Sequence, residues 1–129
     1  MISTLSLLRI AERDGYAVPA FNIFDEASLM AVMAAAEIAE SPVIIQVSTR
    51  TARSIGVEWT GQMFRHAASQ VHVPAALHLD HCPDLSVIRE VVKGEWSSLL
   101  FDASNRGFDS VTVYAVEPAT GRLKFVGCQ

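Results

Sequence analysis

Four strand-like runs recur along the chain, beginning about 25 residues apart, with a helix-like stretch after each of the first three. The runs cover residues 16–23, 42–48, 75–80 and 96–102. The second is continuous and β-branched, as expected for a strand buried on both faces of a parallel sheet. Alternation of strands and helices at this spacing predicts an α/β fold with a parallel sheet and right-handed crossovers.

Helix signals precede the first run and fill the intervals between the runs. Ser3 and Asp25 stand at N-cap positions, and Gly15 and Gly94 follow helix ends. The predicted helices cover residues 3–15, 25–41, 57–71 and 83–92, with a polar stretch at 49–54 before the third. We therefore expect about four βα units, with the helices packed on one side of the sheet.

The rhythm stops after Asp102. Residues 111–116 alternate in the manner of an antiparallel strand, residues 117–121 (EPATG) form a turn, and residues 122–126 form a second strand. The sequence predicts a C-terminal β-hairpin where a further helix is due.

Polar side chains gather at the end of the third run, within PAALHLDHC. Because side chains alternate along a strand, His78 and Asp80 share a face, and His81 joins them if the chain leaves the strand near Asp80. An acid beside an imidazole suits a metal ion and proton transfer. The alternative is a hydrogen-bonded Asp–His pair that caps the next helix.

Three other polar residues, Asn22, Ser48 and Asp102, also end predicted strands. In parallel α/β proteins the carboxyl ends of the strands carry the ligand site. We expect these residues to gather with Asp80 and His81 on one rim. Ser48 has a simpler alternative as a hydroxyl that starts a loop, and His66 and His72 are predicted at the surface.

Composition excludes several classes of protein. The chain has 129 residues, about one domain, and half of them are hydrophobic, which is too rich for disorder. A net charge of −4 gives no reason to expect nucleic acid or an anionic membrane as partner, and no apolar run approaches the length of a membrane span. The two cysteines, Cys82 and Cys128, form no redox or metal motif, so a reduced, cytoplasmic setting is expected.

Four motifs, YAVPAFNI, SPVIIQVS, VPAALHLDHC and LLFDAS, resemble those of class II, metal-dependent aldolases in order and spacing. The resemblance covers about residues 1–104, the N-terminal part of a family that includes fructose-bisphosphate and tagatose-bisphosphate aldolases. It implies a partial (β/α)₈ TIM barrel and reversible cleavage of a ketose phosphate into dihydroxyacetone phosphate and an aldehyde. A divalent metal, usually zinc, polarises the ketone in such enzymes.

The resemblance also implies roles for individual residues. His81 matches the first ligand of the catalytic Zn²⁺, and Asp80 matches the acid/base at the C4 hydroxyl. Ser48 resembles a serine near the substrate phosphate, and Asn22 resembles a substrate-site asparagine. Asp102 matches an acid that holds a second metal position in some members.

The tail has a different resemblance. Residues 103–127, with ASNRG, DSV and PATGRL, are similar to one blade segment of the lactonase family of seven-bladed β-propellers, which includes 6-phosphogluconolactonases. We therefore divide the chain into an aldolase-like half-barrel, 1–104, and a hairpin tail, 105–129. Gene rearrangement and a sequence-assembly join each produce such a chain.

The chain departs from the aldolase pattern in lacking two further histidine ligands, a glutamate and a glycine-rich phosphate loop. One histidine cannot hold catalytic zinc, which needs three protein ligands. The hypotheses are a truncated aldolase that acts on a sugar phosphate but is inactive alone, a non-catalytic half-barrel remnant, and a lactonase-like propeller fragment. Uncovered apolar strand faces, with Ile44, Val47 and Leu77 as candidates, predict a homo-oligomer or an aggregation-prone chain.

Overall fold

The computed structural model describes residues 2–104, 111–116 and 123–128. Its elements follow one another in this order: α1 (Thr4–Asp14), β1 (Ala20–Asn22), α2 (Glu26–Ile38), β2 (Val43–Ser48), α3 (Thr49–Ile55), α4 (Val57–Ser69), β3 (Ala75–Cys82), α5 (Leu85–Val91), β4 (Ser98–Asp102), β5 (Val111–Val116) and β6 (Leu123–Cys128). The turn predicted at 117–121 lies outside the described residues.

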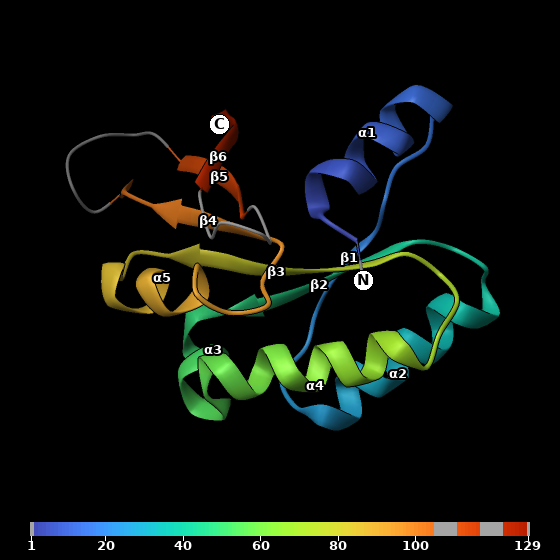
Figure 1. Ribbon diagram of the computed structural model, residues 1–129, viewed down its shortest axis with the longest axis horizontal. Helices are drawn as coiled ribbons and strands as arrows, with labels where there is room; N and C mark the ends of the chain where they lie inside the picture. Colours follow the sequence, from blue (N-terminus) through green and yellow to red (C-terminus); the bar gives the residue numbers. More distant parts are fainter. Residues whose placement is uncertain (1, 105–110, 117–122, 129) are drawn as a thin grey trace.

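The six strands form one sheet in the order of the sequence (Figure 1). β1, β2, β3 and β4 pair in parallel, each with the next, whereas β4–β5 and β5–β6 are antiparallel. The predicted α/β class, the four parallel strands and the C-terminal antiparallel pair are thus confirmed. In register, Ser48 at the end of β2 pairs with Asp80, and β3 continues two residues further to Cys82.

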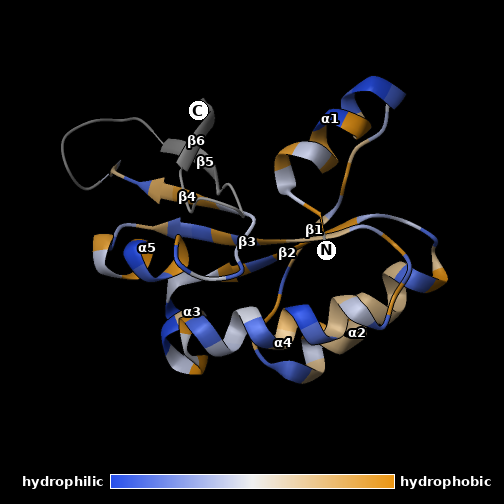
Figure 2. Cartoon of the chain, in the orientation of Figure 1, coloured by the Kyte–Doolittle hydropathy of each residue, from blue (hydrophilic) through white to orange (hydrophobic). Residues whose placement is uncertain are grey.

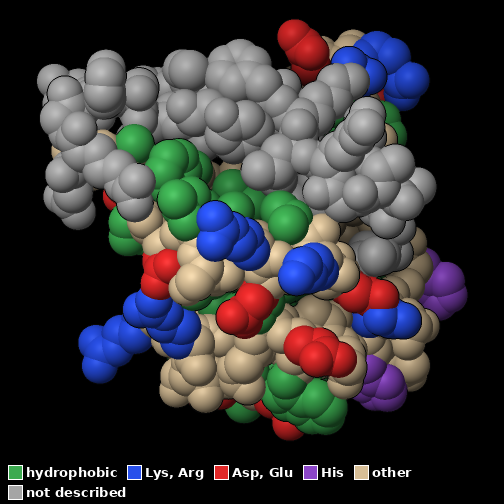
Figure 3. Space-filling view, turned by 60° about the vertical axis from the view of Figure 1, so that its left-hand side comes forward, with side chains coloured by type: hydrophobic (Ala, Val, Ile, Leu, Met, Phe, Trp, Pro, Cys, Tyr) green, Lys and Arg blue, Asp and Glu red, His purple; other side chains and the backbone are tan. Residues whose placement is uncertain are grey.

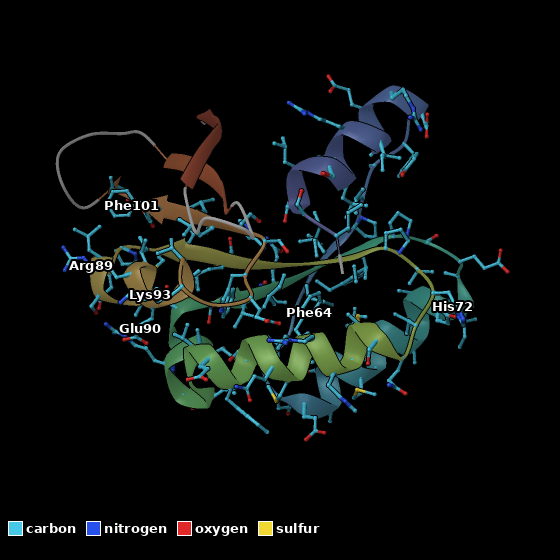
Figure 4. The ribbon with its side chains drawn as sticks, viewed as in Figure 1. Phe64, His72, Arg89, Glu90, Lys93 and Phe101 are labelled. Carbon is cyan, nitrogen blue, oxygen red and sulfur yellow. The ribbon has the colours of Figure 1, made fainter. Side chains whose placement is uncertain are left out.

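Helices α2 to α5 cover one face of the sheet with a large apolar cluster. From the strands, Ile45, Val47, Leu77 and Leu79 point into this cluster and are fully buried. Phe64 points from α4 toward the sheet and is likewise inaccessible (Figure 4). Burial of this kind stabilises by about 1.5–3 kcal/mol for each large side chain, so this face supplies most of the driving force for folding.

Helix α1 lies on the opposite face (Figure 1), which corrects the prediction that all helices pack on one side. Leu7 of α1 packs there against Ile44 and Ala76. The backbone N–H of Ile2 donates to the carbonyl oxygen of Ala75 at 3.1 Å, which ties the N-terminus to β3. The candidates for uncovered apolar strand residues were also wrong: Ile44 lies beneath α1, and Val47 and Leu77 lie beneath the other helices.

Side-chain caps set several helix boundaries. The Ser3 hydroxyl accepts from Ser6 N–H at 3.1 Å, and Gly15 ends α1 at φ 75°, where a side chain is disfavoured. Asp25 caps α2, accepting from Ser28 N–H at 2.8 Å. Ser48 caps α3, which lies in the polar stretch at 49–54, where no helix was predicted. The capping bond from Thr51 N–H to the Ser48 hydroxyl explains why this polar stretch is helical.

Strand β1 is an edge strand with no partner on its outer side among the described residues. It is much shorter than the predicted strand at 16–23, because only three residues reach register with β2. An apolar groove of about 480 Å³ runs beside it, between β1, the start of β2 and α2. Phe21 borders this groove and is 50% exposed. None of the described helices is long and apolar enough to cross a membrane.

Candidate active site at the carboxyl ends of the strands

Strand β3 changes character along its length. Ala75, Ala76 and Leu77 are buried, and the strand then turns polar toward its arrowhead (Figure 2). The pairing of β3 with β4 shifts between Leu79 and Cys82, so the strand carries an irregularity where it becomes polar. Irregularities of this kind re-aim side chains at the ends of strands.

His81 occupies that irregularity with φ 45°, a left-handed backbone conformation that few residues other than glycine adopt. The hydroxyl of Thr49, the first residue of α3, donates to the carbonyl oxygen of His81 at 3.1 Å. The left-handed turn keeps His81 within β3 while releasing its side chain from strict alternation. The strand therefore extends past Asp80, two residues further than predicted.

His81 lies between two carboxylates. Its Nδ1 is 3.3 Å from Asp102 Oδ2, at the end of β4, and its Nε2 is 4.0 Å from Asp80 Oδ1. The imidazole is more than half exposed, whereas the two carboxylates are mostly covered. Of the five residues expected to gather on one rim, Asp80, His81 and Asp102 are joined by these contacts.

Asp102 is held as an anion. The hydroxyl and the backbone N–H of Ser104, with a smaller effect of His81, lower the pKa of the Asp102 carboxyl below its usual value. The Ser104 N–H donates to Asp102 Oδ1 at 3.0 Å. Sequence reasoning missed Ser104 and Thr49. The Asp-Ala-Ser spacing, typical of a turn closed by the side chain of its first residue, was the available signal for Ser104.

Ser48 and Asn22 lie on the same rim but outside this contact group. Ser48 is the register partner of Asp80, and its hydroxyl is occupied by the backbone N–H and hydroxyl of Thr51, at 3.2 and 3.0 Å. Asn22 ends β1 opposite Gln46 and is exposed, two strands away from β3. No hydrogen bond among the described residues joins Asn22 to His81 or the two carboxylates.

His78 lies deeper on the face of Asp80. Its Nδ1 is 2.7 Å from the Ser98 hydroxyl, and the side chain is only 7% exposed. Burial lowers the pKa of His78 to about 4, although the nearby Asp80 acts in the opposite direction. His78 is therefore neutral at physiological pH and adds no positive charge to the rim.

The other candidate groups are structural. His66 and His72 are at the surface as predicted, with His72 Nδ1 2.7 Å from Glu37 Oε1. Cys82 is buried and faces the helix cluster, and burial raises the pKa of its thiol, which disfavours a reactive thiolate. Arg53 pairs with Asp84, the N-cap of α5. This ion pair links α3 to the N-terminus of α5.

A cavity of about 510 Å³ opens away from the rim, between α4 and the end of α5. Both signs of charge line it: Arg65, Lys93, Glu58, Glu90 and Glu95. Arg65 and Glu95 pair with each other. Basic and acidic side chains are likewise interspersed on the face seen in Figure 3. Such a mixture does not single out an ionic ligand.

The rim has the groups for proton transfer but not a complete metal site. A catalytic zinc ion needs three protein ligands and one open position. Within residues 2–104, 111–116 and 123–128, no group of three His, Cys, Asp or Glu side chains is arranged to hold a metal ion. His81 offers one nitrogen. The carboxylates of Asp80 and Asp102 lie next to the imidazole itself and do not surround a common metal position together with it.

Comparison with known protein families gives a match over residues 2–115 to the family described as fructose-bisphosphate aldolase class-II. Among curated proteins, the chain is 32% identical over 108 residues to a sulfofructosephosphate aldolase of Alkalicoccus urumqiensis, covering 84% of this chain and 38% of that protein.

Two crystal structures extend the comparison. The YdjI aldolase of Escherichia coli K12 superimposes with a TM-score of 0.72 at 31% identity, over 84% of this chain and 41% of that one. The fructose-bisphosphate aldolase of Campylobacter jejuni gives a TM-score of 0.55 at 31% identity, over 71% of this chain and 32% of that one. The chain spans less than half the length of each of these proteins, and its parallel strands correspond to part of their barrel.

Proposed function

Because the chain belongs to the class II fructose-bisphosphate aldolase family, we propose that residues 2–104 supply one part of a metal-dependent aldolase site. The reaction is reversible aldol cleavage of a ketose phosphate to dihydroxyacetone phosphate and an aldehyde. The observation that carries the proposal is the position of His81 between Asp80 and Asp102 at the carboxyl rim of a parallel sheet.

In this proposal Asp80 is the acid/base. Its carboxylate takes the proton of the C4 hydroxyl as the C3–C4 bond breaks, and returns it in the condensation direction. The rim suits this role because β2 and β4 flank Asp80, leaving the carboxylate 22% exposed. Asn22 and Ser48 bind the substrate at the ends of β1 and β2, Ser48 near its phosphate.

Zinc polarises the substrate carbonyl when it is bound in such enzymes. The described residues do not fit a complete zinc centre, so His81 is proposed as one ligand only, with Asp102 at a second metal position. The remaining ligands have to come from outside this part of the fold. The chain alone is therefore proposed to be inactive, and the non-catalytic remnant is the second candidate, favoured by the incomplete donor set.

The experiment is a zinc titration by calorimetry, paired with cleavage assays on fructose bisphosphate, tagatose bisphosphate and sulfofructose phosphate. The last substrate is included because of the name of one relative. We expect weak zinc binding, reduced further in His81→Ala but not in His66→Ala, and no turnover. Submicromolar zinc affinity together with zinc-dependent cleavage by the monomer contradicts the proposal of an inactive chain. Loss of zinc affinity in His66→Ala, with none in His81→Ala, contradicts the ligand assignment.

For the tail we infer descent from a lactonase-like propeller segment, with the domain boundary near residue 104. The change from parallel to antiparallel pairing between β4 and β5 supports this boundary. The aldolase family match extends to residue 115, so the two assignments overlap. Direct sequencing of the genomic reading frame around codons 100 to 110 tests the join, and a continuous aldolase reading frame through that region contradicts it.

The proposal also includes a cytoplasmic setting, a sugar phosphate as the small-molecule partner, and self-association of the chain. Exposed apolar side chains at the β1 edge support the last of these, with Phe21 and Phe24 50% and 69% exposed. Light scattering over a concentration series tests it, and a strictly monomeric chain at all concentrations contradicts it.

A further inference from the structure

A chain of buried hydroxyl and imidazole groups joins α1, β4 and β3. The Ser98 hydroxyl donates to the Thr4 hydroxyl at 2.8 Å, and the same Ser98 oxygen lies 2.7 Å from His78 Nδ1. The three residues are only 1% to 7% exposed. Thr4 and Ser98 are 94 positions apart in the sequence, so folding, rather than local structure, assembles this chain.

The direction of these hydrogen bonds fixes the proton on the imidazole. A serine hydroxyl has a single hydrogen to donate. Ser98 gives that hydrogen to Thr4, so its oxygen can only accept from His78, and Nδ1 of His78 must carry the ring proton. Burial keeps the ring neutral, since it lowers the pKa of His78 to about 4. Nε2 is then an unprotonated nitrogen with a free lone pair.

This nitrogen lies on the face of the sheet that carries Asp80. Residues 78 and 80 are separated by one position on β3, so their side chains project to the same side. No hydrogen bond from any described residue reaches Nε2. The only fully covered side-chain nitrogen or oxygen without a partner in the described part of the chain is Glu95 Oε2, so Nε2 of His78 is not fully covered and retains some solvent exposure.

We propose that His78 is a binding residue whose Nε2 accepts a hydrogen bond from a hydroxyl of a polyol ligand. Asp80 contacts a different position of the same ligand. Thr4 and Ser98 are positioning residues that hold the required tautomer. The identity of the ligand as a sugar phosphate rests on the proposed function; the tautomer does not. An acceptor nitrogen suits a hydroxyl-rich substrate because sugar hydroxyls are hydrogen-bond donors.

The first test reads the tautomer by long-range ¹H–¹⁵N correlation on the histidine-labelled chain at neutral pH. We expect the Nδ1–H form in the unmodified chain. Thr4→Val removes the acceptor for Ser98, freeing its hydrogen to turn toward His78, so we expect the Nε2–H form although residue 4 does not touch the imidazole. Ser98→Ala should give the same change, and the conservative Thr4→Ser should preserve the Nδ1–H form. An Nε2–H form in the unmodified chain, or no change in Thr4→Val, overturns the proposal.

The second test adds fructose bisphosphate, without metal, and follows the same nitrogen signal. We expect a shift at His78 Nε2 and an affinity about threefold to tenfold weaker in Thr4→Val, since one net hydrogen bond is lost. Saturating ligand without a shift at Nε2 overturns the hydroxyl contact. Direct zinc binding at Nε2, seen when zinc alone is added, overturns it as well. Failure of the proposed function appears separately, as failure of His81→Ala to affect zinc binding.

Discussion

The two faces of the parallel sheet are built in different ways. One is covered by α2 to α5 and carries a continuous apolar cluster, whereas the other is covered by α1 over a small cluster of Leu7, Ile44 and Ala76. The polar residues of β3 and β4, His78, Asp80 and Ser98, fall on the second face. The comparison shows that one face stabilises the fold through apolar burial, whereas the other carries the polar residues of the candidate site.

The largest expected effect is Leu77→Ala, on the face beneath the helices, and Leu7→Ala is its match on the α1 face. Both side chains are buried to 1% exposure or less. We expect Leu77→Ala to lower the free energy of unfolding by about 4 kcal/mol, and Leu7→Ala by about 2 kcal/mol, because α1 can move to fill part of its cavity. Urea unfolding measures both values. Equal losses contradict the proposed difference between the faces.

A pH titration of stability probes the polar face. The pKa of His78 is about 4 in the folded chain and about 6.5 when unfolded, so the unfolded chain binds more protons between these values. Stability should therefore be complete above about pH 6.5 and fall as the pH drops toward 4, by up to about 3 kcal/mol.

The control for that titration is His78→Asn, which should flatten the curve in this pH window. Ile44→Val loosens the same face without removing a titratable group, so its curve should run parallel to that of the unmodified chain at lower stability. A curve for His78→Asn that still falls by the full amount between pH 6.5 and 4 assigns the acid sensitivity to other residues.

The smallest expected effect concerns the helix that covers the polar face. Ser3→Ala removes the N-cap of α1 and should lower stability by about 1 kcal/mol. Ser3→Asp keeps an acceptor at the cap and should retain most of that stability. Hydrogen exchange should show faster opening confined to the backbone amides of α1. Equal acceleration across α4 contradicts an effect confined to α1.

Most of this fold follows from local signals. Hydrophobic runs and caps located the four parallel strands and four of the five helices, because the strand–helix rhythm leaves few alternatives. Helix α3 was not predicted, because Ser48 was interpreted as a loop or substrate residue rather than as an N-cap. The side on which α1 packs depends on contacts between segments far apart in the sequence, such as that of Ile2 with Ala75, which periodicity does not encode.

The candidate site was only partly readable. Strand ends located Asp80 and Asp102, but the left-handed backbone of His81 has no sequence signature beyond the tolerance of histidine for it. The buried chain from Thr4 to His78 could not be anticipated, because its members come from three separate elements. A hydrogen-bond direction is a property of the assembled structure, so no pattern in the sequence could predict the tautomer of His78.

The antiparallel pairing of β5 with β4 limits how further strands can be added to the sheet. A ring of parallel strands has to be closed by joining its first strand to its last, with all strands running the same way. Here β5 pairs with the outer edge of β4 and runs antiparallel to it, and β6 pairs with β5. The outer edge of β1 has no partner among the described residues. A strand that runs parallel to β4 can therefore pair directly with it only after the hairpin has left that edge, so closure into an all-parallel ring requires the hairpin to release β4 first.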